Sequence, residues 1–159
     1  VNLQIDIQTE SAEPVPDEDD IRHWIAAALH DQRTEDTEVS VRLVDEAEMA
    51  GLNQAWRGKP GPTNVLSFPS DLPLEPALPL LGDIVVCVPV VRREAAAQSK
   101  PLQAHWAHML VHGTLHLLGY DHIEDEQAEA MEALETRILA TLDYPCPYRG
   151  DHAEEQASA

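Results

Sequence analysis

The chain has 159 residues and a formal net charge of −19, from 29 acidic and 10 basic side chains. This length suits one domain with a single hydrophobic core, and no run of about 18 apolar residues is present, which excludes a transmembrane helix. Two cysteines without motif spacing argue against a disulfide framework, so we expect a cytoplasmic protein with reduced thiols.

The acidic charge opposes binding to the phosphate backbone of nucleic acids, but it is unevenly distributed. Residues 57–100 hold five basic and four acidic side chains, a local net charge of +1, so the rest of the chain carries −20. We therefore expect any RNA-binding surface in this segment, with a protein partner to help position the RNA.

The first half of the chain alternates between strand and helix patterns. Alternating apolar residues predict strands at residues 3–7 and 39–43. Between them, acidic side chains at residues 17–20 precede an apolar stripe of helical period. That stripe consists of Ile21, Trp24, Ile25, Ala28 and Leu29. Asp45 is placed to cap a second helix that ends near Trp56, and residues 58–62 are expected to form a loop rich in glycine and proline.

The second half continues the alternation. It predicts a short strand at residues 65–68, a proline-rich loop at 72–79 and a buried strand at 84–88. Pro89 and Pro101 are each expected to open a helix, the second of them long and apolar. The last helix is predicted from an apolar stripe at Ala128, Met131, Leu134 and Ile138.

These elements predict an α+β fold, in which a small mixed four-stranded sheet packs with about five helices. We expect residues 1–148 to form a single metal-dependent hydrolase domain and residues 149–159 to form an acidic, disordered tail.

Three histidines lie within eleven residues, at positions 112, 116 and 122. His112 and His116 are four residues apart, so a helix presents both imidazoles on one face, within reach of one ion. Gly119 lies where a helix takes a left-handed residue, which lets the chain turn back and bring His122 to the same point. We therefore predict one Zn²⁺ ion with His112, His116 and His122 as ligands and an open fourth position, as in catalytic zinc sites.

The spacing H-x3-H-x2-G-x2-H is also that of the metzincin proteases, which carry a glutamate general base directly after the first histidine. This chain has Gly113 there, so the predicted site is metzincin-like but lacks the protease base. The bare backbone at Gly113 lets another group approach the helix and could make room for substrate. His108 and His116 are about 12 Å apart along the helix axis, too far for one ion, so His105 and His108 are expected to pack or to line the approach.

Phosphodiester cleavage is one reaction that such a site supports. A zinc ion held by neutral imidazoles can lower the pKa of bound water to about 7 and can polarise a phosphoryl oxygen. Arg57 is the best candidate for a second, catalytic cation, because its guanidinium matches two phosphate oxygens and stays protonated. Without a match to a known family, a surface salt bridge is the favoured interpretation of this residue. Asp121 could orient a histidine ligand, and no general base is evident.

Several short sequence motifs between residues 52 and 122 resemble those of a known protein family. They are Leu52 to Lys59, Thr63 to Pro69, Leu81 to Ile84, and His108 to Gly113 followed by the remaining histidines. In this order they resemble the YbeY family of bacterial ribosomal RNA maturation factors. The family usually has Asp where this chain has Asn64, an amide that is neutral and also donates, which leaves the contribution of this loop open.

The resemblance implies a zinc-dependent, single-strand-selective endoribonuclease. Such an enzyme acts in 3′-end maturation of small-subunit ribosomal RNA and in ribosome quality control. Its partners would be single-stranded RNA and the ribosome or ribosomal proteins, with no DNA and no membrane.

Two other functions remain open from the sequence. A metallopeptidase would use the same histidines with a base from elsewhere, and Gly113 argues against it. A ribosome-assembly factor would hold zinc as a structural ion, and three ligands rather than four weigh against that role.

Overall fold

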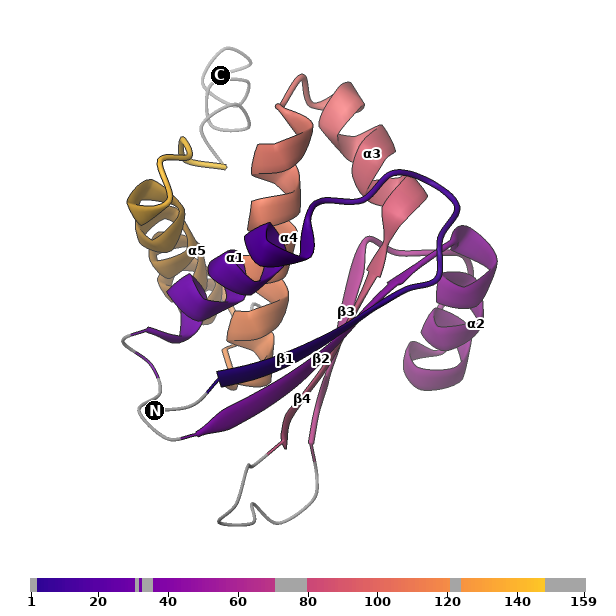
Figure 1. The fold of residues 1–159 in the computed structure, drawn as a ribbon, viewed down its shortest axis with the longest axis horizontal. Coiled ribbons are helices and arrows are strands. Elements are labelled where there is room, and N and C mark those ends of the chain that lie inside the picture. Colours follow the sequence, from indigo (N-terminus) through magenta and orange to yellow (C-terminus); the bar gives the residue numbers. More distant parts are fainter. Residues whose placement is uncertain (1–2, 31, 33–35, 71–79, 121–123, 148–159) are drawn as a thin grey trace.

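The computed structural model describes residues 3–30, 32, 36–70, 80–120 and 124–147 (Figure 1). In chain order these residues form β1 (Leu3–Thr9), α1 (Glu18–Leu29), β2 (Thr37–Val44), α2 (Glu46–Arg57), β3 (Val65–Pro69), β4 (Leu80–Cys87), α3 (Val88–Ala97), α4 (Leu102–Leu117) and α5 (Asp125–Thr141). The predicted α+β fold, with four strands and five helices, is confirmed for the described part of the chain. Within it, none of the helices combines the length and hydropathy that crossing a bilayer requires.

The sheet is mixed, as the sequence predicts. Its strand order is β1-β2-β4-β3, in which β1, β2 and β4 run parallel and β3 pairs antiparallel with β4. Among the described residues β3 has one neighbouring strand, β4, so its other backbone edge is unpaired within that part of the chain. That unpaired edge is where the candidate site lies.

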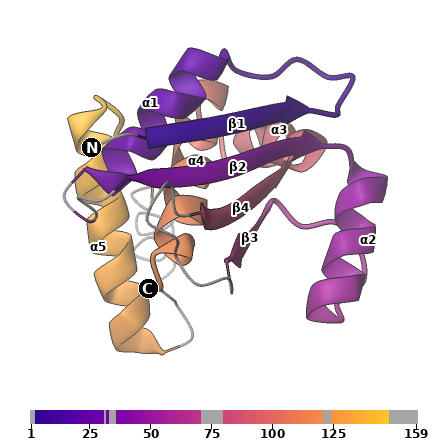
Figure 2. The same cartoon turned by 60° about the horizontal axis from the view of Figure 1, so that its bottom comes forward.

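The two faces of the sheet pack against different helices (Figures 1 and 2). Side chains alternate between faces along β4, so Ile84 and Val86 join the larger core with α1, α4 and α5. Val85 and Cys87 point the other way and pack with Met49 of α2. Helix α2 therefore covers the opposite face from α1, α4 and α5.

Helix α4 lies at the centre of the larger core. Its side chains Trp106, Leu110 and Leu115 are at most 1% exposed, as expected for the predicted apolar helix. Gly119 takes a left-handed conformation with a φ of 103°, and the N–H of Tyr120 donates to the carbonyl of Leu115 at 3.1 Å. This closing turn confirms the role predicted for Gly119 and fixes where the histidine-bearing helix ends.

Two local expectations need correction. Asp45 does precede α2, but its side chain makes no capping bond and instead accepts a hydrogen bond from the Ser11 hydroxyl. Pro101 is the cap residue of α4, one position before its first helical residue. The loop predicted at residues 72–79 and the tail at 149–159 lie outside the described residues.

Candidate metal centre

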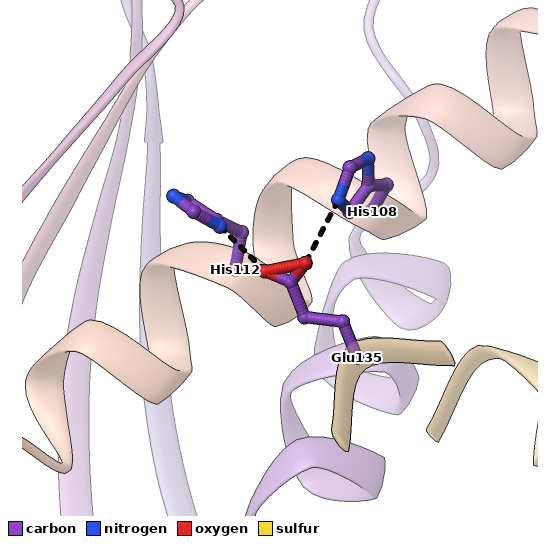
Figure 3. A group of neighbouring side chains, drawn as sticks. All are labelled: His108, His112 and Glu135. Carbon is purple, nitrogen blue, oxygen red and sulfur yellow. Dashed lines mark hydrogen bonds and ion pairs between the residues drawn. The ribbon is translucent and has the colours of Figure 1, made fainter. Parts of the chain in front are cut away.

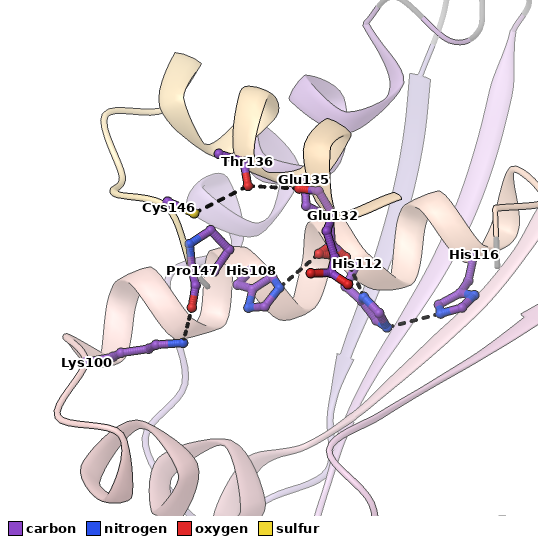
Figure 4. Close-up of polar contacts among 9 residues, drawn as sticks. All are labelled: Lys100, His108, His112, His116, Glu132, Glu135, Thr136, Cys146 and Pro147. Atoms are coloured by element: carbon purple, nitrogen blue, oxygen red, sulfur yellow. Dashed lines mark hydrogen bonds and ion pairs between the residues drawn. The ribbon is translucent and has the colours of Figure 1, made fainter. Parts of the chain in front are cut away.

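Helix α4 brings His112 and His116 together, as the spacing predicts. Their Nε2 atoms are 3.0 Å apart and their ring centroids 4.5 Å apart, with the ring planes at 80° (Figure 4). Two nitrogen ligands of one tetrahedral zinc ion lie about 3.3 Å apart. The pair therefore fits a single ion with little adjustment. The third predicted ligand, His122, and the orienting residue Asp121 lie outside the described residues.

A buried carboxylate holds the other side of the His112 ring. Glu135 of α5 is fully buried, and its two oxygens contact different histidines of α4 (Figure 3). The Nδ1 of His112 lies 2.6 Å from Oε1 of Glu135, and the Nε2 of His108 lies 3.1 Å from Oε2. The carboxylate thus bridges two imidazoles that are one helical turn apart.

The protonation states follow from this arrangement. Burial alone would raise the pKa of Glu135, but hydrogen bonds and charge interactions with His108 and His112 lower it to about 2. Burial lowers the pKa of His108, so a neutral imidazole donates its Nε2 proton to the carboxylate. An ionised Glu135 can only accept, so the Nδ1 of His112 is the donor, and the Nε2 of the same ring faces the Nε2 of His116.

His108, His112 and Glu135 also form a group that could itself hold a metal ion, because each offers a ligand atom within 4.8 Å of the others. The contact of 2.6 Å between His112 and Glu135 is, however, the length of a charge-assisted hydrogen bond. It is shorter than the separation of about 3.3 Å between two ligands of one tetrahedral ion. The geometry therefore favours Glu135 as a support for His112.

Arg57 and the histidine pair line the same cleft, which has a volume of about 740 Å³. The other lining residues are Thr63, Asn64, Val65, Leu66, Ser67, Pro69, Gly119 and Tyr120. In the described part of the chain no carboxylate pairs with Arg57, whereas Arg93 pairs with Glu46 at 2.8 Å and Arg92 approaches Glu13 at 3.9 Å. Of these three arginines, Arg57 is the one with its charge available to an anion in the cleft.

Gly113 does let another group approach α4, but that group is the sheet. A Cβ atom at Gly113 would lie 3.0 Å from Cγ2 of Ile84 and 3.2 Å from Oγ of Ser67. The Ser67 hydroxyl also donates to the Gly113 carbonyl at 2.8 Å. The expectation that this bare backbone makes room for substrate is therefore wrong, and a glutamate base at this position would have to enter the sheet.

The amide of Asn64 has a partner that explains why an amide suits this position. Its Nδ2 lies 3.2 Å from both carboxylate oxygens of Glu94, and its Oδ1 accepts from the N–H of Val65 at 2.7 Å. Glu94 also contacts Nε2 of His105 at 3.0 Å, and His105 is buried, as predicted. An aspartate at position 64 has no proton to donate to Glu94.

Glu135 was missed in the sequence, although a signal for it exists. The apolar stripe of α5 runs through Met131, Leu134, Ile138 and Leu139, all of which are buried. Glu135 lies four residues after Met131 and three before Ile138, within that stripe. A carboxylate on the buried face of a helix needs a buried partner, and the histidines of α4 were the available candidates.

Fold and site together define a small mixed α+β protein with a histidine and carboxylate cluster at the wall of an open cleft. The family model for endoribonuclease YbeY matches residues 4–143, nearly all of the described chain. The chain therefore belongs to the endoribonuclease YbeY family, and the resemblance noted from its sequence blocks is confirmed.

Individual relatives agree with the family model. An endoribonuclease YbeY from Pseudomonas fluorescens is 56% identical over 152 residues, which cover 95% of this chain and 99% of the relative. One from Cellvibrio japonicus is 58% identical over 146 residues, which cover 91% and 82%. A solution structure of a Thermotoga maritima protein matches with a TM-score of 0.58 and 27% identity over 88% of this chain and 92% of that one. The predicted class of enzyme, an endoribonuclease, is confirmed at the level of the family.

Proposed function

We propose that the protein is a zinc-dependent, single-strand-selective endoribonuclease that acts in 3′-end maturation of small-subunit ribosomal RNA and in ribosome quality control. It works in the cytoplasm, which suits two cysteines, Cys87 and Cys146, that are free thiols. The ribosome or ribosomal proteins are its partners, and they offset the poor attraction that a chain of charge −19 has for RNA.

The observation that carries the proposal is the orientation of the His112 ring. Glu135 accepts a hydrogen bond from the Nδ1–H of His112, which leaves the Nε2 atoms of His112 and His116 facing each other, where both can bind one ion between them. His122 supplies the third ligand, from the segment that follows the closing turn at Gly119. A zinc ion bound there would supply activated water and a Lewis acid for a phosphoryl oxygen.

The remaining chemistry belongs to residues of the cleft. Arg57 binds the phosphate next to the scissile bond through two parallel hydrogen bonds and stabilises the charge that develops in the transition state. Asn64 and Ser67 also line the cleft, and they orient the RNA strand. Gly113 lies against the sheet, which disfavours the metallopeptidase alternative because its usual base has no space there.

The test compares the metal content and substrate range of the wild type with those of His116→Ala. We expect the wild type to bind about one zinc ion per chain, cleave a single-stranded RNA, and leave a matched duplex and casein intact. His116→Ala should lose most of its zinc and its RNA cleavage while keeping its melting temperature within a few degrees, because His116 faces the cleft rather than the core.

His23→Ala is the matched control, because His23 is an exposed histidine of α1 remote from the cleft lining. It should behave as the wild type does in every assay. Cleavage of casein by the wild type would move the assignment to a peptidase. Full RNA cleavage by a zinc-free His116→Ala protein would refute the metal-dependent mechanism.

A further inference from the structure

Trp56 is an exposed tryptophan in a protein that buries its other two. The side chains of Trp24 and Trp106 are 2% and 1% exposed, whereas Trp56 is 69% exposed. Among the described residues, the only other exposed large hydrophobic side chain is Leu102, at 36%, about half the exposure of Trp56. An indole ring left in water costs free energy, so its position needs a reason.

Trp56 does not itself line the candidate cleft, but it is joined to residues that do, through the chain and through the packing of its ring. Trp56 directly precedes Arg57, which lines the cleft, and its ring meets the ring of Phe68 edge-on with centroids 5.8 Å apart and planes at 66°. Phe68 belongs to β3, whose neighbouring residues Ser67 and Pro69 line the same cleft. Figure 2 shows α2 standing apart from α1 and α5, toward the β3 side of the sheet.

Local structure holds the ring in place. Gly58 ends α2 in a left-handed conformation with a φ of 66°, and its N–H donates to the Gln54 carbonyl at 3.1 Å. The buried amide of Asn53 donates to the Gly61 carbonyl at 2.8 Å, which ties the following loop back to the helix. Trp56 therefore lies at a capped helix end, and its ring packs against the ring of Phe68.

Charge alone cannot give this protein much affinity for RNA. It carries 29 acidic and 10 basic side chains. Two of the basic side chains, Arg92 and Arg93, already form ion pairs with Glu13 and Glu46. A flat aromatic ring next to Arg57, which pairs with no described carboxylate, supplies affinity of another kind, since bases stack on aromatic side chains in a sequence-tolerant way. Only unpaired bases have a face available for such stacking, so the contact would also select single strands.

We propose that Trp56 is a stacking platform for an unpaired base of single-stranded RNA, next to the phosphate that Arg57 binds. The inference rests on the proposed function, in that it takes the cleft to be an RNA site. It adds the contact that distinguishes a single strand from a duplex, which neither Arg57 nor the histidines can do.

The test measures binding apart from cleavage. The probes are a labelled 12-nucleotide single-stranded oligoadenylate, the same strand with abasic ribose at every position, and a 12-base-pair RNA duplex, each followed by fluorescence anisotropy. Trp56→Ala should weaken binding of the oligoadenylate by about 5- to 150-fold, the usual contribution of one stacked base. It should leave binding of the abasic strand and the duplex within twofold of the wild type.

Two variants separate stacking from a general loss of structure. Trp56→Phe keeps a ring and should retain most of the affinity. Leu102→Ala removes the other large hydrophobic side chain that is exposed in the described part of the chain, and it should leave binding unchanged. RNA should also shield the exposed tryptophan of the wild type from iodide quenching, a signal to which the buried Trp24 and Trp106 contribute little. Melting temperatures of all variants establish that they fold.

Three outcomes would overturn the inference. They are unchanged oligoadenylate binding by Trp56→Ala, an equal loss on the abasic strand, and a change in self-association without a change in RNA binding, which would mark Trp56 as a protein contact. The inference and the proposed function can fail separately. If RNA binding depends on Trp56 but the protein does not cleave RNA, the nuclease mechanism is wrong and the stacking platform stands. If the protein cleaves RNA but binding does not depend on Trp56, the stacking platform is wrong and the nuclease mechanism stands.

Discussion

His112 and Glu135 are 23 residues apart in the sequence, yet Nδ1 of the imidazole lies 2.6 Å from Oε1 of the carboxylate. The contact joins α4 to α5 across the main core and leaves the opposite nitrogen of the ring facing the cleft (Figure 4). A hydrogen bond of this kind fixes both the tautomer and the orientation of a metal-binding histidine.

Glu135→Gln should therefore weaken metal binding without removing a ligand. A glutamine has one acceptor oxygen for two imidazole donors, so either His108 or His112 would face an N–H group instead. We expect zinc affinity to fall by about 10- to 100-fold, measured by competition with a chromophoric chelator. Glu129→Gln is the control, because Glu129 is exposed on the same helix. Unchanged affinity in Glu135→Gln would show that His112 needs no such support.

Arg57→Ala should separate cleavage from metal binding. Arg57 lines the cleft without an ion pair to any described carboxylate, so its removal should leave zinc content and melting temperature unchanged. Single-turnover RNA cleavage should fall by about 10²–10³-fold, as is usual when one transition-state donor is lost. Arg57→Lys should recover only part of the rate, because an ammonium group cannot make the two parallel hydrogen bonds.

Arg93→Ala is the matched control, since Arg93 is an exposed arginine already paired with Glu46. It should cleave RNA at the wild-type rate. Full activity in Arg57→Ala would show that the arginine is dispensable, and loss of zinc in that variant would show that it holds the metal site together.

The local part of the site was predictable from the sequence. An interval of four residues places two side chains on one face of any helix, and Gly119 is compatible with the left-handed turn that ends α4. Both predictions depend on helix geometry alone. They could therefore be made without knowing how the helix packs in the fold.

The parts contributed by distant segments were not predictable in the same way. Glu135 contacts His112 only because α5 packs against α4, and the sequence contains no rule for which helices meet. Gly113 was assigned to the substrate side because the sequence does not say which face of α4 lies on β3 and β4. Pairing between Asn64 and Glu94 likewise depends on how α3 sits beside β3.

Gly113→Ala and Gly51→Ala should have opposite effects on stability. Both glycines lie inside helices, where alanine is favoured by up to about 1 kcal/mol. A Cβ at Gly51 meets nothing within 4 Å, so Gly51→Ala should stabilise the protein by about 0.5–1 kcal/mol. A Cβ at Gly113 lies 3.0 Å from Ile84, and overpacking of about 1–3 kcal/mol should exceed the helix gain.

Urea denaturation of the two variants and the wild type measures these differences. Gly113→Glu should be far less stable than Gly113→Ala and should gain no activity on casein, because its carboxylate would be buried against the sheet. A Gly113→Ala protein as stable as Gly51→Ala would mean that α4 and the sheet separate easily at this point.

Asn64→Asp should destabilise the protein in a manner that depends on pH. Burial would raise the pKa of Glu94, but hydrogen bonds from His105 and Asn64 outweigh it and lower the pKa below 4.5. A carboxyl group with a lowered folded-state pKa contributes stability above its unfolded pKa, and that contribution is lost as the pH falls through the folded pKa. Aspartate at position 64 removes the donor and places a second negative charge beside Glu94.

The loss of stability should therefore be about 1–3 kcal/mol at pH 7 and should shrink toward pH 4, where one carboxyl group of the pair takes up a proton. Urea denaturation between pH 4 and pH 7 measures this loss of stability. The control is Gln103→Glu, which replaces an exposed amide that donates to Asp20 at 3.0 Å. That control should cost less than about 0.5 kcal/mol at any pH, because exposed charges are well screened. An Asn64→Asp penalty that is the same at pH 4 and pH 7 would show that the penalty does not come from the charge of Glu94, since aspartate keeps the oxygen that accepts from the N–H of Val65.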